Sequence, residues 1–135
     1  MSYLLDANAC IHLINGTSPP LLKRFRLESP MSLRMSSVVK AELVFGARNS
    51  SRAAENLRMI AGFWEPFESL PFDDASAEQY GLVRAELKRQ GRLIGSNDML
   101  IAATALAFDA TLVTHNTREF VRVPGLKLED WELPT

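Results

Sequence analysis

Long hydrophobic runs are missing from this chain. No apolar stretch in its 135 residues approaches the ~18 residues that suggest a membrane-spanning helix, so no membrane association is expected. The first residues also lack the basic segment, apolar segment and cleavage site of a secretion signal. Cysteine occurs only as Cys10, which excludes an internal disulfide and fits a reducing compartment. We therefore expect a cytoplasmic protein.

A strong charge of either sign is missing as well. The net charge is −1 at pH 7, with 47% hydrophobic and 23% charged residues, which is typical of an ordinary globular protein. Length and composition together predict one domain over residues 1–135, with a substantial hydrophobic core. This charge balance gives no overall basic signature of a nucleic-acid-binding protein.

The basic residues are nevertheless grouped along the chain. The three groups are Lys23, Arg24 and Arg26; Arg84, Lys88, Arg89 and Arg92; and Arg118, Arg122 and Lys127. Each group alone is typical of a solvated helix face. They would form a nucleic-acid surface only if the fold brought them to one side of the molecule.

Short apolar runs alternate with segments of helical periodicity, which predicts an α/β protein with a mainly parallel sheet. The expected strands cover residues 3–6, 33–36, 67–72, 111–114 and, at an edge, 126–128. The expected helices cover residues 7–15, 21–28, 38–48, 52–63, 74–91, 99–108 and a short segment within 115–120. Trp131 is expected to anchor the tail.

Acidic side chains interrupt the most apolar stretches. Asp6, Glu42 and Asp98 each lie within or beside one of the three most apolar segments, and Asn116 and Glu119 follow the strand at 111–114. In a parallel sheet, the places where strands hand over to helices lie at one edge, so these side chains could face one crevice. Three or four oxygen ligands without a His–Cys cluster suit Mg²⁺ or Mn²⁺ and not zinc.

Most of these residues also have a purely structural interpretation. Asp6 is placed to cap the first helix, and Asp98 is a first-turn acid of the kind that the helix dipole favours. Asn116 and Glu119 have the spacing of a capping box.

Glu42 is harder to explain structurally. It lies in mid-helix among apolar residues, so it needs either a partner such as Lys40 or an open cavity. The two histidines, His12 and His115, have no metal-ligand spacing. We expect His12 on a helix surface and His115 in a loop near the carboxylates.

Four segments of the chain resemble the four motifs of PIN-domain nucleases. They are Leu5-Asp6-Ala7-Asn8, Ala41-Glu42-Leu43-Val44-Phe45-Gly46-Ala47, residues 94–103 and residues 112–120. Their order, spacing and flanking residues agree, and the match runs nearly end to end. The tail at 122–131 is similar to the VapC toxins of bacterial toxin–antitoxin modules, especially the group that cuts initiator tRNA in the anticodon loop. Two departures are Ala7, where many relatives have Thr, and Asn116, where some have an acid.

The resemblance implies a three-layer α/β/α sandwich with a parallel sheet of four or five strands. It also implies a Mg²⁺- or Mn²⁺-dependent endoribonuclease in which water attacks the phosphodiester bond. Asp6, Glu42 and Asp98 would bind the metal, supported by Asn116 and Glu119. The candidates for holding the RNA backbone are Lys88, Arg89, Arg92 and Arg118.

The expected partners are RNA, in particular tRNA, a VapB-like antitoxin and a second copy of the chain in a homodimer. The antitoxin could insert a basic side chain among the carboxylates. A groove for the rest of it could be formed by Leu21, Phe25, Phe63 and Trp64, although residues of this kind more often belong simply to the core.

Two other functions fit parts of the same pattern. One is a PIN-like RNA-binding module without activity, although the chain retains all four acids. The other is a haloacid-dehalogenase-like phosphatase, because Asp6-x-Asn8 follows a strand; the second acid of that motif is replaced by Asn8. Metal-dependent RNA cleavage, measured with and without EDTA, separates these functions.

Overall fold

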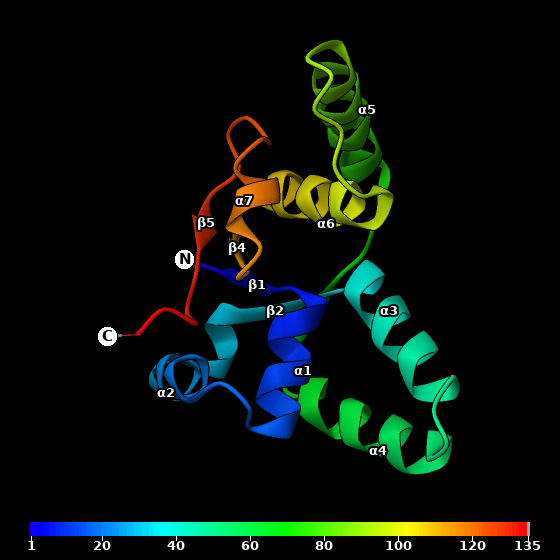
Figure 1. Ribbon diagram of the computed structural model, residues 1–135, viewed down its shortest axis with the longest axis vertical. Helices are drawn as coiled ribbons and strands as arrows, with labels where there is room; N and C mark the ends of the chain where they lie inside the picture. Colours follow the sequence, from blue (N-terminus) through cyan, green and yellow to red (C-terminus); the bar gives the residue numbers. More distant parts are fainter. Residues whose placement is uncertain (135) are drawn as a thin grey trace.

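A five-stranded parallel sheet forms the centre of the computed structural model, which describes residues 1–134 (Figure 1). Its strands are β1 (Tyr3–Leu5), β2 (Leu33–Ser36), β3 (Glu68–Leu70), β4 (Thr111–Val113) and β5 (Leu128–Glu129). The order across the sheet is β3-β2-β1-β4-β5, and each neighbouring pair is parallel. The carboxyl ends of all strands therefore meet at one edge.

Helices cover both faces of this sheet. They are α1 (Ala7–Asn15), α2 (Pro19–Leu27), α3 (Ser37–Arg48), α4 (Ala53–Trp64), α5 (Asp74–Arg89), α6 (Ser96–Ala107) and α7 (Thr117–Phe120), with a 3₁₀ turn η1 (Pro30–Ser32). In Figure 1, α1, α2 and α4 lie on one side of the sheet and α5 and α6 on the other. The predicted three-layer α/β/α sandwich is thus confirmed. None of the helices within residues 1–134 has the length and apolar character needed to cross a membrane.

β1 is the central strand, and its composition explains why. Leu4 and Leu5 are fully buried, as is usual for a parallel strand that helices cover on both faces. β2 and β4 flank it and bury Leu33, Met35 and Leu112 in the same core. The first residues of the chain therefore lie at the heart of the fold, and the side chain that follows Leu5 emerges at the middle of the carboxyl edge.

The tail is fixed as predicted. Trp131 is only 5% exposed and packs edge-on against Tyr3, with 5.1 Å between the ring centroids. The Arg24 guanidinium lies 4.6 Å from the centroid of the Trp131 ring. These contacts hold the segment after β5 against the start of β1.

Several element boundaries differ from the sequence prediction, and three of them have a clear physical reason. α2 begins at Pro19 and not at residue 21, because proline is tolerated in the first turn of a helix. β3 ends at Leu70, since Pro71 lacks the backbone N–H that would continue the ladder. β5 lies at Leu128–Glu129 because pairing with Leu112 and Val113 sets its register.

Candidate carboxylate site

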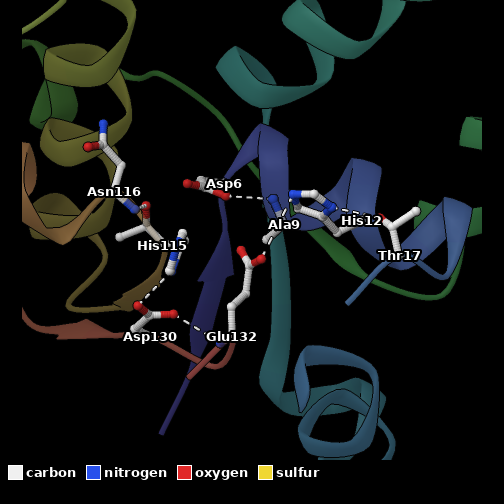
Figure 2. Close-up of polar contacts among 9 residues, drawn as sticks. Asp6, Ala9, His12, Thr17, His115, Asn116, Asp130 and Glu132 are labelled. Carbon is white, nitrogen blue, oxygen red and sulfur yellow. Dashed lines mark hydrogen bonds and ion pairs between the residues drawn. The ribbon is translucent and has the colours of Figure 1, made fainter. Parts of the chain in front are cut away.

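Asp6 lies at the carboxyl end of β1 and caps α1 (Figure 2). Its Oδ1 accepts a hydrogen bond from the backbone N–H of Ala9 at 2.8 Å, and the Thr114 hydroxyl donates to the same carboxylate. The residue is 7% exposed, and burial raises its pKa despite these two hydrogen bonds. The predicted capping role is real. It uses one carboxylate oxygen and is compatible with a second role for the other.

Glu42 lies on α3 and carries a buried carboxylate oxygen, Oε1, that has no hydrogen-bond partner within residues 1–134. Burial raises its pKa, and the negative charge of Asp6 raises it further. The predicted partnership with Lys40 is wrong, because the Lys40 ammonium lies over the Trp64 ring, 4.9 Å from its centroid. Glu42 instead lines a cleft on each side of α3, so the open-cavity interpretation holds.

Asp98 and Glu119 meet at Gly95. The backbone N–H of Gly95 donates to Glu119 Oε1 at 3.0 Å, and Asn116 Nδ2 donates to Glu119 Oε2 at 2.7 Å. A methyl group on Gly95 would lie 3.4 Å from Asp98 Oδ2, so the Asp98 carboxyl rests against the same backbone. The predicted capping box is wrong: the Asn116 side chain caps no helix N–H, and Glu119 reaches the start of α6.

The pKa values show that these acids share one electrostatic environment. Burial raises the pKa of Asp98 to about 7, together with its hydrogen bond to Glu119 and the charges of Glu119, Glu42 and Asp6. The pKa of Glu119 is lowered instead, because Gly95 and Asn116 donate to its ionised form. Four carboxyl groups from β1, α3, α6 and α7 thus converge at the carboxyl edge of the sheet.

The donor set is made only of hard oxygens, which suits Mg²⁺ or Mn²⁺. None of the four carboxylates forms an ion pair with a Lys or Arg of residues 1–134. Over the same residues, no three His, Cys, Asp or Glu side chains stand in a ready-made arrangement for an ion. Two effects account for this. The negatively charged carboxylates repel one another, and those of Asp6 and Glu119 point toward the backbone N–H groups of Ala9 and Gly95, from which they accept hydrogen bonds.

The family model of the PIN domain matches residues 3–126. The chain belongs to the PIN-domain family. It is 41% identical over 131 residues to the tRNA(fMet)-specific endonuclease VapC of Shigella flexneri, an alignment that covers 97% of this chain and 98% of the relative. It is 38% identical over 133 residues to ribonuclease VapC2 of Rickettsia felis, with 98% and 99% covered. Membership of this family removes the haloacid-dehalogenase-like alternative.

Solved structures agree with this assignment. The DNA-bound VapBC of Salmonella typhimurium aligns with a TM-score of 0.91 at 37% identity, covering 97% of this chain and 98% of that one. VapBC2 of Rickettsia felis, bound to a DNA fragment from their promoter, aligns with a TM-score of 0.90 at 37% identity, covering 97% and 99%. The PIN fold therefore extends over nearly the whole chain.

Sequence reasoning missed several residues around Asp6 in this PIN-domain protein. A cavity of about 230 Å³ is lined by Asp6, Asn8, His12, His115, Asn116 and Glu132. His115 Nδ1 lies 2.9 Å from Asp130 Oδ2, and this carboxylate raises the pKa of His115 (Figure 2). The signal was present in the sequence, because Asp130 and Glu132 follow the last strand as Asp6 follows the first.

The fold brings parts of two basic groups together, whereas Lys127 lies at Asp109, beyond the other end of α6. Arg92 lies in the loop that leads to Gly95, and Arg122 donates from Nη1 to Leu93 O in that loop at 3.3 Å. Lys88 and Arg118 are exposed. Arg89 is exposed but paired with Glu86, with Nε 2.8 Å from Oε2. The group on α2 lies elsewhere, as Figure 1 shows.

Of the four residues predicted to form a groove for the antitoxin, Leu21 belongs to the core, and Phe25, Phe63 and Trp64 are half-buried and pack on it, so this groove stays a prediction. Leu21 is fully buried, and the rings of Phe25 and Phe63 stack with 6.1 Å between their centroids. A separate cleft of about 380 Å³ lies between α1, α3 and α4. Its apolar wall includes Ile11, Met59 and Ile60, and it opens beside Glu42.

Proposed function

We propose that this PIN-domain protein is a divalent-metal-dependent endoribonuclease toxin that cleaves structured RNA in the cytoplasm, in particular initiator tRNA in its anticodon loop. One observation carries the proposal: carboxyl groups from four separate elements converge at the carboxyl edge of the sheet, with no Lys or Arg of residues 1–134 ion-paired to them. A partly buried acidic cluster without a counter-ion is unfavourable, and a bound cation would relieve the repulsion.

The residues fit a hard divalent cation. Asp6, Glu42 and Asp98 would hold Mg²⁺ or Mn²⁺, and the unpartnered Oε1 of Glu42 is the kind of atom that such an ion satisfies. When bound, the ion supplies a Lewis acid that polarises the phosphate and acidifies water.

The protein's own residues then position groups and hold protons. Asn116 and Gly95 keep Glu119 ionised and oriented, so it is suited to orient the attacking water and accept its proton. Thr114 and Ala9 fix Asp6 in the same way. In-line attack on phosphorus by water would leave 5′-phosphate and 3′-hydroxyl ends.

The relatives support the choice of substrate and partner. The Shigella flexneri protein is named for action on tRNA(fMet), and the Salmonella typhimurium and Rickettsia felis structures are VapBC complexes. At 37–41% identity over nearly full length, the same substrate and a VapB-like antitoxin are the natural proposals here, and the homodimer stays a prediction from the sequence. Exposed Lys88, Arg92 and Arg118 are the candidates for holding the RNA backbone, with Arg89 weakened by its pairing to Glu86.

The direct test is cleavage of purified initiator tRNA by the purified protein. We expect cuts in the anticodon loop with Mn²⁺ or Mg²⁺ and none with EDTA, with the ends identified by sequencing. A linear RNA of the same composition is the control, because sequence-specific recognition of RNA favours splayed loop bases. Equal cleavage of both RNAs refutes the specificity, and binding without any cleavage favours the inactive RNA-binding module.

A further inference from the structure

A second cleft lies on the other side of α3, and an exposed aromatic ring stands beside it. The cleft has a volume of about 440 Å³ and lies between α3 and α6. Val38, Ala41 and Leu100 give it an apolar wall, and Glu42, Phe45 and Asn97 complete the lining. It therefore begins at one of the four carboxylates.

The position of Phe45 beside Glu42 distinguishes it from other exposed hydrophobic residues. Its side chain is 70% exposed, and single exposed hydrophobic residues are common on protein surfaces. This ring, however, lies three residues after Glu42 on the same helix, so both side chains lie on the same face of α3. Asn97 on the opposite wall directly precedes Asp98. The two carboxylates and the two walls of the cleft therefore come from the same two helices.

The lining suits a neutral, planar, partly polar ligand. Phe45 offers a face for stacking, and the Asn97 amide offers both donor and acceptor groups. No Lys or Arg is among the lining residues, and Glu42 would repel a phosphate placed here.

We propose that this cleft binds the unstacked base of a nucleotide next to the cleaved phosphodiester, with Phe45 as the stacking platform and Asn97 reading the base edge. This inference rests on the proposed endoribonuclease function and adds a specificity subsite to it. Because Glu42 belongs to both the carboxylate cluster and the cleft, a base held here keeps its own phosphate near the reacting position.

The test uses an RNA hairpin whose loop carries 2-aminopurine on either side of the cut site. Binding is followed by 2-aminopurine fluorescence with Ca²⁺, and single-turnover cleavage is followed with Mn²⁺. The variants are Phe45→Leu, which keeps an apolar side chain without a ring, and Phe45→Tyr, which keeps the ring. Leu27→Ala is the matched control, since Leu27 is 75% exposed at the end of α2, in the segment that leads to the opposite edge of the sheet.

Wild type, Phe45→Tyr and Leu27→Ala should quench the fluorescence of one of the two positions and cleave at equal rates. Phe45→Leu should lose the quenching and cleave roughly 5- to 150-fold more slowly at subsaturating protein, the range expected for one lost stacking contact. Asn97→Ala should keep the quenching but lose the wild type's preference among the four bases at that position.

Three results would overturn the proposal. One is a Phe45→Leu variant that matches wild type in both quenching and cleavage, and another is an Asn97→Ala variant that keeps the full base preference. A changed oligomeric state of Phe45→Leu in light scattering, with quenching intact, assigns the ring to a contact between copies. If wild type quenches through Phe45 but never cleaves RNA with Mn²⁺, the base subsite stands and the proposed nuclease function fails.

Discussion

Acidic side chains are accommodated in two opposite ways in this protein. Near β5, Glu28 and Glu129 share one cation, with their Oε1 atoms 2.9 and 3.3 Å from Arg24 Nη2, and the same guanidinium packs on Trp131. At the carboxyl edge of the sheet, the four carboxylates have hydrogen-bond donors at Asp6 and Glu119 but no Lys or Arg in an ion pair within residues 1–134.

The contrast shows how structural and functional acids differ. The acids around Arg24 carry their own counter-charge. In the cluster, burial raises the pKa of Asp6, Glu42 and Asp98, and repulsion by other members raises it further at Glu42 and Asp98. Unfavourable electrostatics of this kind are typical of a site that takes its counter-charge from a ligand.

The largest expected effect is on catalysis. Asp98→Asn nearly preserves shape while removing one negative charge from the cluster, so we expect Mn²⁺-dependent RNA cleavage to fall by more than roughly 100-fold, beyond the effect of losing an outer-shell partner. Glu28→Gln, which removes a charge beside Arg24, should leave the rate unchanged. Single-turnover cleavage of initiator tRNA measures both, and a similar loss in the two variants would contradict the distinction.

The second effect is on stability without metal. The pKa of Asp98 is raised from its ordinary value of 3.8 to about 7 in the folded protein, so the folded state holds this proton more tightly than the unfolded chain does. The resulting stabilisation is complete below the lower value and is lost as pH rises through the higher one. Above pH 7, Asp98→Asn should therefore be more stable than wild type in EDTA and should gain less from Mn²⁺. Urea unfolding on both sides of pH 7 measures this.

Glu28→Gln should behave in the opposite way. It breaks a partly exposed ion pair, which stabilises a protein by about 0–1 kcal/mol, and should lower the free energy of unfolding equally with EDTA and with Mn²⁺. If Asp98→Asn follows this pattern instead, Asp98 is an ordinary first-turn acid and the shared metal site is wrong.

The smallest effect concerns the basic residues. Lys88→Ala and Arg92→Ala should each reduce the slope of log binding affinity against log salt by about 0.7–0.9, the value for one lost phosphate contact. Arg89→Ala should change the slope less, because Arg89 is already paired with Glu86. Lys23→Ala, on α2, is the control. Filter binding of tRNA at several salt concentrations measures the slopes. Equal slopes for all variants would show that these residues are ordinary solvated surface residues that contact no phosphate.

The sequence predicts the position of an acid correctly where the order of strands and helices alone determines that position. Asp6 follows a buried strand and Asp98 opens a buried helix, and parallel topology brings both to one edge. Glu42 is different, because its lack of a partner follows from α3 packing on α4, where Trp64 takes up Lys40. That contact depends on tertiary structure and leaves no trace in local spacing.

Glu119 shows the same limit more sharply. Its spacing from Asn116 fits a capping box, which is a local rule. The decisive donor is the backbone N–H of Gly95, 24 residues earlier in the chain. Likewise β5 takes its register from Leu112 and Val113, which its own short sequence does not specify.

The central position of β1 also has a consequence for the order in which the protein is made. Asp6 is among the first residues to leave the ribosome, yet its backbone N–H bonds to Val113 O, and its strand pairs with β4, which starts at Thr111. At about 5–20 residues per second, synthesis of the intervening 105 residues (111 − 6) takes about 5–20 s. Throughout that time the nascent chain lacks Glu119 and the strand that closes the site. A translating ribosome therefore carries a chain whose carboxylate cluster is still incomplete, and a chain released before residue 111 lacks both β4 and Glu119.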